Sequence, residues 1–218
     1  MPKISEFEKG HQYFRSVNFK KNEERFKKLV EEGQNPKALF IGCSDSRVMP
    51  NMITGSGPGD LFILRNVGNF VPPFSPDNDF HATAAAIEYA VTHLNVSDII
   101  VCGHSDCGAI KACFEVLEAP ETVDEENIHT YKWLQLGADA CSMARRGLSE
   151  ESREAQRDFA EKASVVFQLE NLLSYPAVRR RVDAGELFLH GWHYDLATGA
   201  ILYFDESELE FKPLGGKQ

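Results

Sequence analysis

Short apolar runs alternate with longer amphipathic segments along this chain. Three runs, at 38–43 ("ALFIGC"), 61–64 ("LFIL") and 99–102 ("IIVC"), are continuous and apolar, as strands buried on both faces are. Between the second and third runs, residues 79–95 repeat apolar side chains at helical spacing. Strands that alternate with helices indicate right-handed crossovers and a parallel sheet.

The second half of the chain begins with helical patterns and ends with strand patterns. Residues 128–144 and 152–175 predict helices, and Pro176 ends the second of them. Residues 186–195 and 201–206 predict a final strand and an antiparallel hairpin partner. We therefore expect an α/β fold: a mainly parallel sheet of four to five strands, flanked by helices, with an antiparallel last strand.

The N-terminal segment has a helical pattern of its own. Residues 18–33 place their apolar side chains roughly on one helical face, and Gly33 is a plausible stop. No linker rich in Pro, Ser or Gly and no internal repeat divides the 218 residues. The expectation is one α/β domain over 1–218 with an N-terminal helical arm at about 1–35.

Composition narrows the environment and the partners. Hydrophobic residues make up 43% of the chain, enough for a substantial core. With 33 acidic and 23 basic residues the net charge is −10, which argues against nucleic acid as a partner. No apolar stretch approaches membrane-spanning length, and the N-terminus lacks the apolar core of a secretion signal. Five cysteines, an odd number, fit a reducing compartment, so we expect a soluble cytoplasmic protein with thiols available as ligands.

The stretch "GHSDCGA" at 103–109 joins a predicted strand to a predicted helix, where α/β proteins place ligands. It lacks the Lys and Ser/Thr of a phosphate loop, and Cys107 stands where a nucleophile elbow needs its closing Gly. His104 and Cys107, three residues apart, offer a nitrogen and a thiolate that both suit zinc. That pair alone is weak evidence for a metal site.

A third ligand comes from "CSDSRV" at 43–48. Cys43 ends another predicted strand, and the carboxyl ends of parallel strands meet at one edge of a sheet. Cys, His and Cys with one open position make a zinc site of the catalytic type. Cys102, the nearest rival ligand, lies within an apolar strand and is assigned to the core.

The two motifs, in this order, resemble those of the β-class carbonic anhydrases. The likeness continues through "GDLFILRNVGNFVPP", "AAIEYAV" and "HGWHYD" and spans roughly residues 18–205. The resemblance implies a zinc enzyme that hydrates CO2 reversibly to bicarbonate and a proton, with one zinc per chain. Its ligands would be Cys43, His104 and Cys107, and zinc-bound hydroxide would attack the carbon of CO2. Because two thiolates offset the charge of the ion, we expect activity to rise toward alkaline pH.

The resemblance also implies roles for residues beside the metal. Asp45 would pair with Arg47 and orient the hydroxide, or swing onto zinc and close the site. The self-closing subtype of the family has a Trp where this chain has Phe40, which argues against bicarbonate-triggered closure. The chain is closer to the plant-type, open-site subgroup. The substrate-binding residues that this subgroup implies are Gln34, acting across a subunit boundary, and the apolar Phe62, Val67 and Tyr89.

Assembly and alternatives follow from the same resemblance. Family members form dimers or multiples of dimers, so a homodimer or a dimer-based tetramer or octamer is expected. Two other functions stay open: zinc-dependent hydrolysis of CS2 or COS at the same site, and a non-catalytic bicarbonate-binding protein with structural zinc. The retained Asp45, Arg47 and Gln34 favour the enzyme, and the ordinary pocket residues favour CO2, a small apolar substrate.

Overall fold

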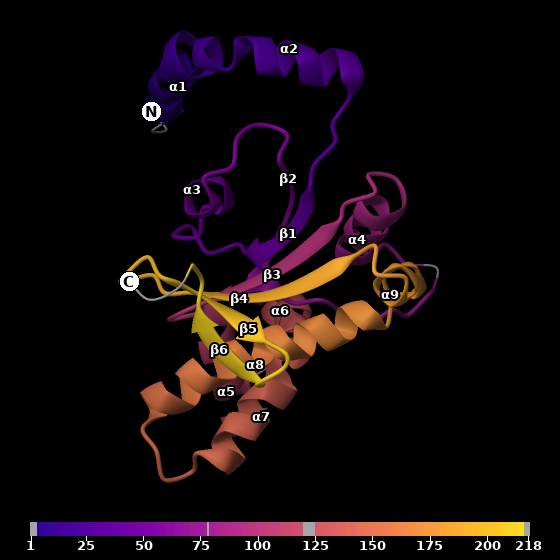
Figure 1. The fold of residues 1–218 in the computed structure, drawn as a ribbon. Helices are drawn as coiled ribbons and strands as arrows, with labels where there is room; N and C mark the ends of the chain where they lie inside the picture. The colour runs from indigo at the N-terminus through magenta and orange to yellow at the C-terminus, as the bar shows by residue number, and fades with distance from the viewer. Residues whose placement is uncertain (1–3, 78, 120–124, 216–218) are drawn as a thin grey trace.

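The chain folds around one sheet with helices packed on it (Figure 1). The computed structural model describes residues 4–77, 79–119 and 125–215. Within this part, six strands have the order β2-β1-β3-β4-β5-β6; the first four in that order are parallel, and β5 and β6 are antiparallel. The strands are β1 (Ala38–Cys43), β2 (Leu61–Asn66), β3 (Asp98–His104), β4 (Phe188–Tyr194), β5 (Ile201–Asp205) and β6 (Glu210–Pro213).

The helices connect the parallel strands and build a second layer. They are α1 (Ile4–Tyr13), α2 (Glu23–Glu32), α3 (Pro50–Thr54), α4 (Ala82–Thr92), α5 (Gly108–Glu118), α6 (Ile128–Leu134), α7 (Ala138–Gly147), α8 (Arg153–Leu173) and α9 (Pro176–Asp183). A π-helical turn, Phe14–Phe19, follows α1. The prediction of an α/β fold with a mostly parallel sheet, helices on the sheet and an antiparallel end is confirmed.

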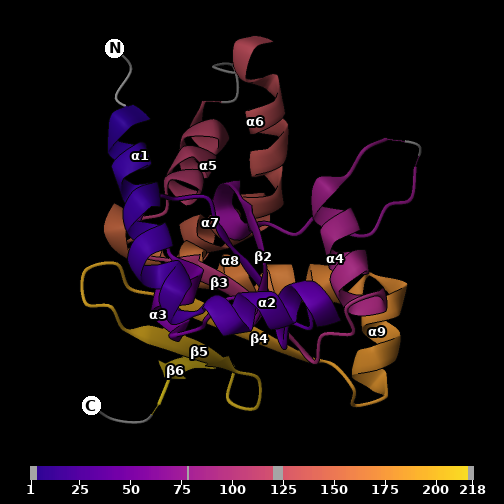
Figure 2. The same ribbon diagram turned by 90° about the horizontal axis from the view of Figure 1, so that it is seen from above.

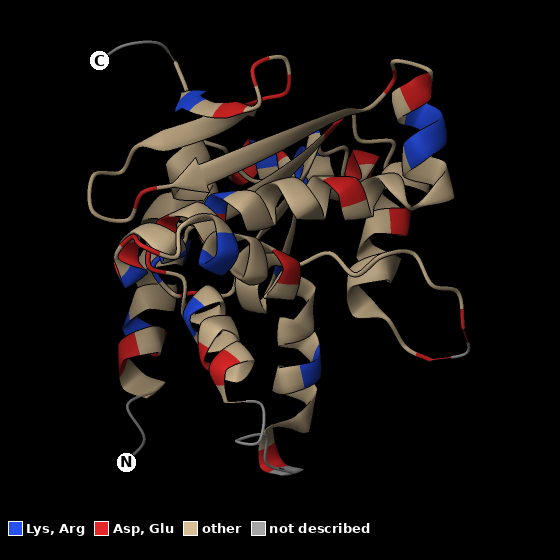
Figure 3. Cartoon of the chain, turned by 90° about the horizontal axis from the view of Figure 1, so that it is seen from below, with Lys and Arg blue, Asp and Glu red and all other residues tan. Residues whose placement is uncertain are grey.

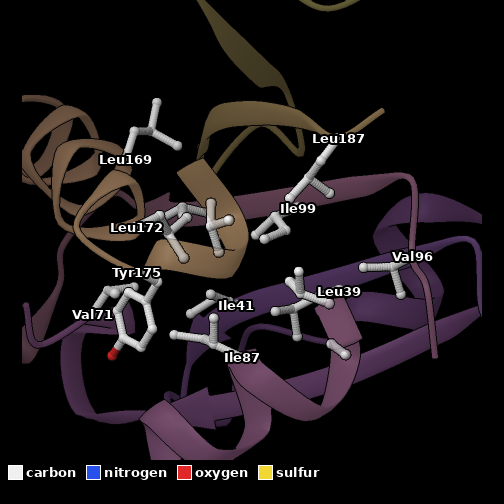
Figure 4. Close-up of a cluster of buried hydrophobic side chains, with 14 of the residues drawn as sticks. Leu39, Ile41, Val71, Ile87, Val96, Ile99, Leu169, Leu172, Tyr175 and Leu187 are labelled. Carbon is white, nitrogen blue, oxygen red and sulfur yellow. The ribbon is translucent and has the colours of Figure 1, made fainter. Parts of the chain in front are cut away.

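Alternate residues of the interior strand β1 enter two different cores. Leu39 and Ile41 point to the face covered by α4, α8 and α9, where they pack with Ile87 and Leu172 (Figure 4). This period-two alternation is the normal geometry of a strand, and burial on both faces accounts for the unbroken apolar run. All six β1 residues are buried.

The opposite face of the sheet is only thinly covered. Ala38, Phe40, Ile100 and Cys102 form a small buried cluster there, with the α3 residue Ile53 packed against it. Cys102 is fully buried, as predicted for a core residue.

Two strands differ from the prediction. β2 is the outer strand, paired only with β1, and its burial is partial, with Ile63 38% exposed. The expectation that residues 61–64 are buried on both faces was therefore wrong. The sheet also has a sixth strand, β6, beyond the four to five expected. Its four residues are too few, and too polar at Glu210 and Lys212, to form an apolar run.

The N-terminal arm lies apart from this body. Figure 1 shows α1 and α2 beyond β1, and in Figure 2, seen from above, α2 projects over the strands. Neither helix has a buried residue. Arg25 of α2 links the arm to the body: it pairs with Asp60 at 2.7 Å and donates to the Pro58 carbonyl at 2.7 Å.

Charged residues are distributed over the helices and loops of the fold. In Figure 3, acidic and basic residues are interspersed along the helices and loops. Among the described residues, no helix has both the length and the apolarity that a membrane crossing needs.

Candidate metal centre

Three ligand atoms meet at the carboxyl end of the sheet. Cys43 is the last residue of β1, His104 is the last of β3, and Cys107 precedes the first residue of α5. β1 and β3 are adjacent and in parallel register, Gly42 beside Cys102, so their ends bring Cys43 and His104 together. The ligand atoms of Cys43, His104 and Cys107 lie within 4.8 Å of one another. All three side chains are buried, with exposures of 5%, 1% and 3%.

A tight turn returns the chain from His104 to the start of α5. Asp106 has φ of +56°, the left-handed region that Asp tolerates better than most residues. Cys107 then takes an extended conformation as the N-cap of α5. Because of this turn, the ligand atoms of His104 and Cys107, which are three residues apart, lie close together.

The sulfur of Cys43 is held by several donors. Hydrogen bonding from the Cys107 thiol is the largest cause that lowers the pKa of Cys43, to about 4; the backbone N–H groups of Asp45 and Gly68 contribute. Both N–H groups lie 3.4 Å from Sγ. The same contact raises the pKa of Cys107. A divalent cation bound by both sulfurs would favour their thiolate form.

His104 completes a donor set that fits a metal. Its Nδ1 donates to the Ser105 carbonyl at 2.9 Å, because a carbonyl oxygen only accepts. The remaining nitrogen, Nε2, is buried and has no hydrogen-bond partner among the described residues. A buried nitrogen without a partner is costly unless something binds it. Two sulfurs and this nitrogen therefore fit a metal ion that prefers soft and intermediate ligands.

Asp45 and Arg47 form a bidentate pair beside the three ligands. Arg47 donates from Nε to Oδ1 at 3.0 Å and from Nη2 to Oδ2 at 2.8 Å. Those hydrogen bonds hold the pKa of Asp45 well below its usual range, so the carboxylate stays ionised. Arg47 also donates to Asp106, to Oδ2 at 3.2 Å and to the carbonyl at 3.1 Å. It thus ties the 43–48 loop to the turn that carries the other two ligands.

Two further residues contact this centre. The resemblance indicated Arg65 only as a match to an Arg of the bicarbonate pocket of the self-closing subtype, and nothing in the sequence indicated Glu161. Arg65 donates to the carbonyls of Cys43 at 2.9 Å and Asp45 at 2.6 Å. Glu161 on α8 accepts the backbone N–H of Cys107 at 2.9 Å. Glu161 lies in an ordinary amphipathic helix, 54 positions from Cys107, so no local signal could have indicated it.

The residues expected to bind substrate are spread over the surface near β2. Val67 is 46% exposed and lines a cavity of about 750 Å³ together with Ser44, the neighbour of Cys43. The rings of Phe62 and Tyr89 are in contact, with centroids 5.8 Å apart. Gln34 is exposed just after α2 and lines a separate hollow with Asp60. The described chain thus brings Val67 to the cavity beside the metal ligands, and Gln34 belongs to another surface.

Comparisons with known proteins agree with this geometry. The sequence model of the family described as "Carbonic anhydrase" matches residues 38–201. A carbonic anhydrase of Helicobacter pylori (strain J99) is 37% identical over 204 residues, covering 91% of each chain. The solved structure of the β-carbonic anhydrase CcaA is 36% identical, with a TM-score of 0.89 over 98% of this chain and 93% of that one. A tetrameric β-carbonic anhydrase of Sordaria macrospora is 27% identical, with a TM-score of 0.75 over 99% and 98%.

The chain belongs to the carbonic anhydrase family, and within it to the β class. It is therefore an enzyme that interconverts carbon dioxide with bicarbonate and a proton. The comparisons do not favour the two alternatives, hydrolysis of CS2 or COS and a non-catalytic bicarbonate-binding protein.

Proposed function

We propose that the reaction takes place at one zinc ion per chain, held by Cys43, His104 and Cys107. The observation that carries this proposal is the convergence of three buried ligand atoms within 4.8 Å, one of them a nitrogen without a hydrogen-bond partner in the described part of the chain. Two thiolates and one imidazole are a common zinc set that keeps a fourth position open. When bound there, zinc supplies Lewis acidity that makes water a nucleophile near neutral pH.

Asp45 is proposed to accept a hydrogen bond from the attacking water molecule and to orient it toward the carbon of CO2. Support comes from its low pKa, which keeps the carboxylate an acceptor throughout the neutral range. Arg47 is proposed to hold Asp45 in this place, since it engages both carboxylate oxygens. While that pair is intact, Asp45 is not available as a fourth metal ligand.

The substrate pocket is proposed to be apolar and to form between two copies of the chain. Phe62, Val67 and Tyr89 would line it, and the exposure of Val67 and Tyr89, 46% and 43%, leaves them free to be covered by a partner. Gln34 would donate a hydrogen bond to substrate in the neighbouring subunit, as in the plant-type subgroup. A homodimer would then be the smallest active unit, with a tetramer or octamer built from dimers.

The cytoplasm is the proposed compartment. All five cysteines are free and buried, which suits a reducing environment. Buried thiolate ligands would also be protected there from oxidation.

The test of this function is stopped-flow CO2 hydration, followed with a pH indicator, on purified protein of known zinc content. We expect one zinc per chain and rapid turnover that rises toward alkaline pH. Zinc-replete protein that is inactive at every pH would reject the open catalytic site. Turnover of COS or CS2 at a higher kcat/KM than CO2 would assign the other substrate class.

A further inference from the structure

Glu161 is a charged residue in a place where charge is unusual. It projects from α8 and is only 5% exposed. A buried carboxylate is costly to a fold unless donors surround it. The contacts of Glu161 therefore indicate the role of this buried carboxylate.

Each carboxylate oxygen of Glu161 faces one neighbour. Oε1 accepts the backbone N–H of the metal ligand Cys107 at 2.9 Å. Oε2 lies 3.5 Å from Nε2 of His193, a β4 residue that is 2% exposed. The imidazole of His193 is thus next to the carboxylate oxygen that does not bind Cys107.

Helix α8, which carries Glu161, packs closely against β3, the strand that ends at His104. A β-carbon at Gly103, the residue before His104, would lie 2.7 Å from Cγ2 of Val165 and 3.5 Å from the carbonyl oxygen of Glu161. Only glycine permits this approach, so α8 is seated closely at the carboxyl end of β3. Glu161 is consequently held at a defined distance from the turn at 104–107.

We propose that Glu161, backed by His193, is a positioning residue for the metal ligand Cys107, whose backbone it ties to α8 so that the thiolate is held toward the metal. This inference rests on the proposed zinc centre. The hydrogen bond to the Cys107 amide orients the peptide plane between Asp106 and Cys107, and that plane sets the direction of the Cys107 side chain.

The turn itself needs such a support. Asp106 is in the left-handed region, which costs a residue with a β-carbon roughly 1–2 kcal/mol. Without Glu161, the amide of Cys107 would be a buried donor that loses its partner. Partners of this kind, one step removed from the metal, typically change metal affinity about 10–100-fold when they are removed.

The experiment measures zinc release from the full-length, zinc-loaded protein into excess chelator, followed with a chromogenic zinc indicator. Glu161→Gln keeps an acceptor oxygen of the same reach. Glu161→Asp keeps the charge but draws it back by roughly 1.5 Å, beyond hydrogen-bond reach of the Cys107 amide. Ser164→Ala is the matched control, because Ser164 is a buried polar residue of the same helix whose Oγ has no partner among the described residues.

We expect Glu161→Asp to release zinc about 10–100-fold faster than wild type. Glu161→Gln is expected to stay within about threefold of wild type, as is Ser164→Ala. Glu161→Ala should behave like the Asp variant; if it fails to fold, the comparison of Asp with Gln still decides. Release at the wild-type rate from Glu161→Asp, or equally fast release from both variants, would overturn the inference. Wild-type protein that binds no zinc would instead reject the zinc centre itself.

Discussion

The metal centre and the N-terminal arm are opposites in how they are held. Each of the three candidate metal ligands is at most 5% exposed; Cys43 and His104 end the strands β1 and β3, and Cys107 lies at the N-cap of α5. The arm, α1 and α2, has no buried residue. The difference shows that one chain alone can hold the three candidate metal-ligating side chains in place. The arm, in contrast, carries its apolar side chains on a surface that a single copy does not cover.

The largest effect is expected from breaking the metal centre. Cys107→Ala should abolish zinc binding and lower CO2 hydration by about 10³-fold or more, because the Lewis acid is lost. Zinc per chain by elemental analysis and stopped-flow hydration measure this. The control is Cys102→Ala, a buried cysteine two residues before His104, which should keep its zinc at a stability cost of about 1 kcal/mol. A fully active Cys107→Ala protein would contradict the ligand assignment.

The second-largest effect is expected from a change that leaves zinc binding intact and lowers catalysis. Asp45→Asn should keep one zinc per chain and lower kcat roughly 10²-fold, because a preorganised acceptor is lost. The pKa of Asp45 is held well below its usual range, so the carboxylate loses its charge only in strong acid. The rate ratio of wild type to variant should therefore be constant between about pH 6 and 9. A ratio that collapses within that range would show that Asp45 titrates there.

A substitution in the arm should weaken oligomer assembly and leave the folding of a single chain unchanged. Phe7 is 78% exposed on α1, so Phe7→Lys should change the unfolding free energy of a single chain by no more than about 0.5 kcal/mol. If a second copy covers it, the dissociation constant of the oligomer should rise about 10–100-fold. Sedimentation velocity over a dilution series measures this, with Lys9→Ala as a control on the same helix. A wild-type protein that is monomeric at all concentrations would remove the proposed role of the arm.

The smallest effect is expected at Gln34, just after the arm helix α2. Gln34→Ala should lower kcat/KM by about 3–10-fold, the value of one hydrogen bond, and leave zinc binding unchanged. Asn35→Ala, at the neighbouring exposed position, is the control. Mixing Gln34→Ala chains with zinc-free Cys107→Ala chains should raise the rate per zinc-containing site, because the partner then supplies the missing amide. No recovery after subunit exchange would argue against action between subunits.

Much of the fold could be predicted because its signals are local. The runs at 38–43 and 99–102 are apolar throughout, and the structure makes them β1 and β3, buried in the middle of the sheet. The run at 61–64 has the same pattern, yet β2 is an outer strand. A strand face that another chain would cover can have the same apolar composition as a face buried in the chain's own core. The apolar pattern along the sequence therefore does not distinguish the two cases.

From the amino-acid order alone follow the α/β class, the family and the residues that can ligate a metal, since these depend on short motifs and on regular spacing. Long-range packing determined the contacts that hold the site together. The contact of Cys43 with Cys107, the link from Arg47 to Asp106, and the contact of Glu161 with the Cys107 amide join residues from separate elements. Such contacts arise only when helices seat on the sheet at defined distances, and no spacing along the chain encodes those distances.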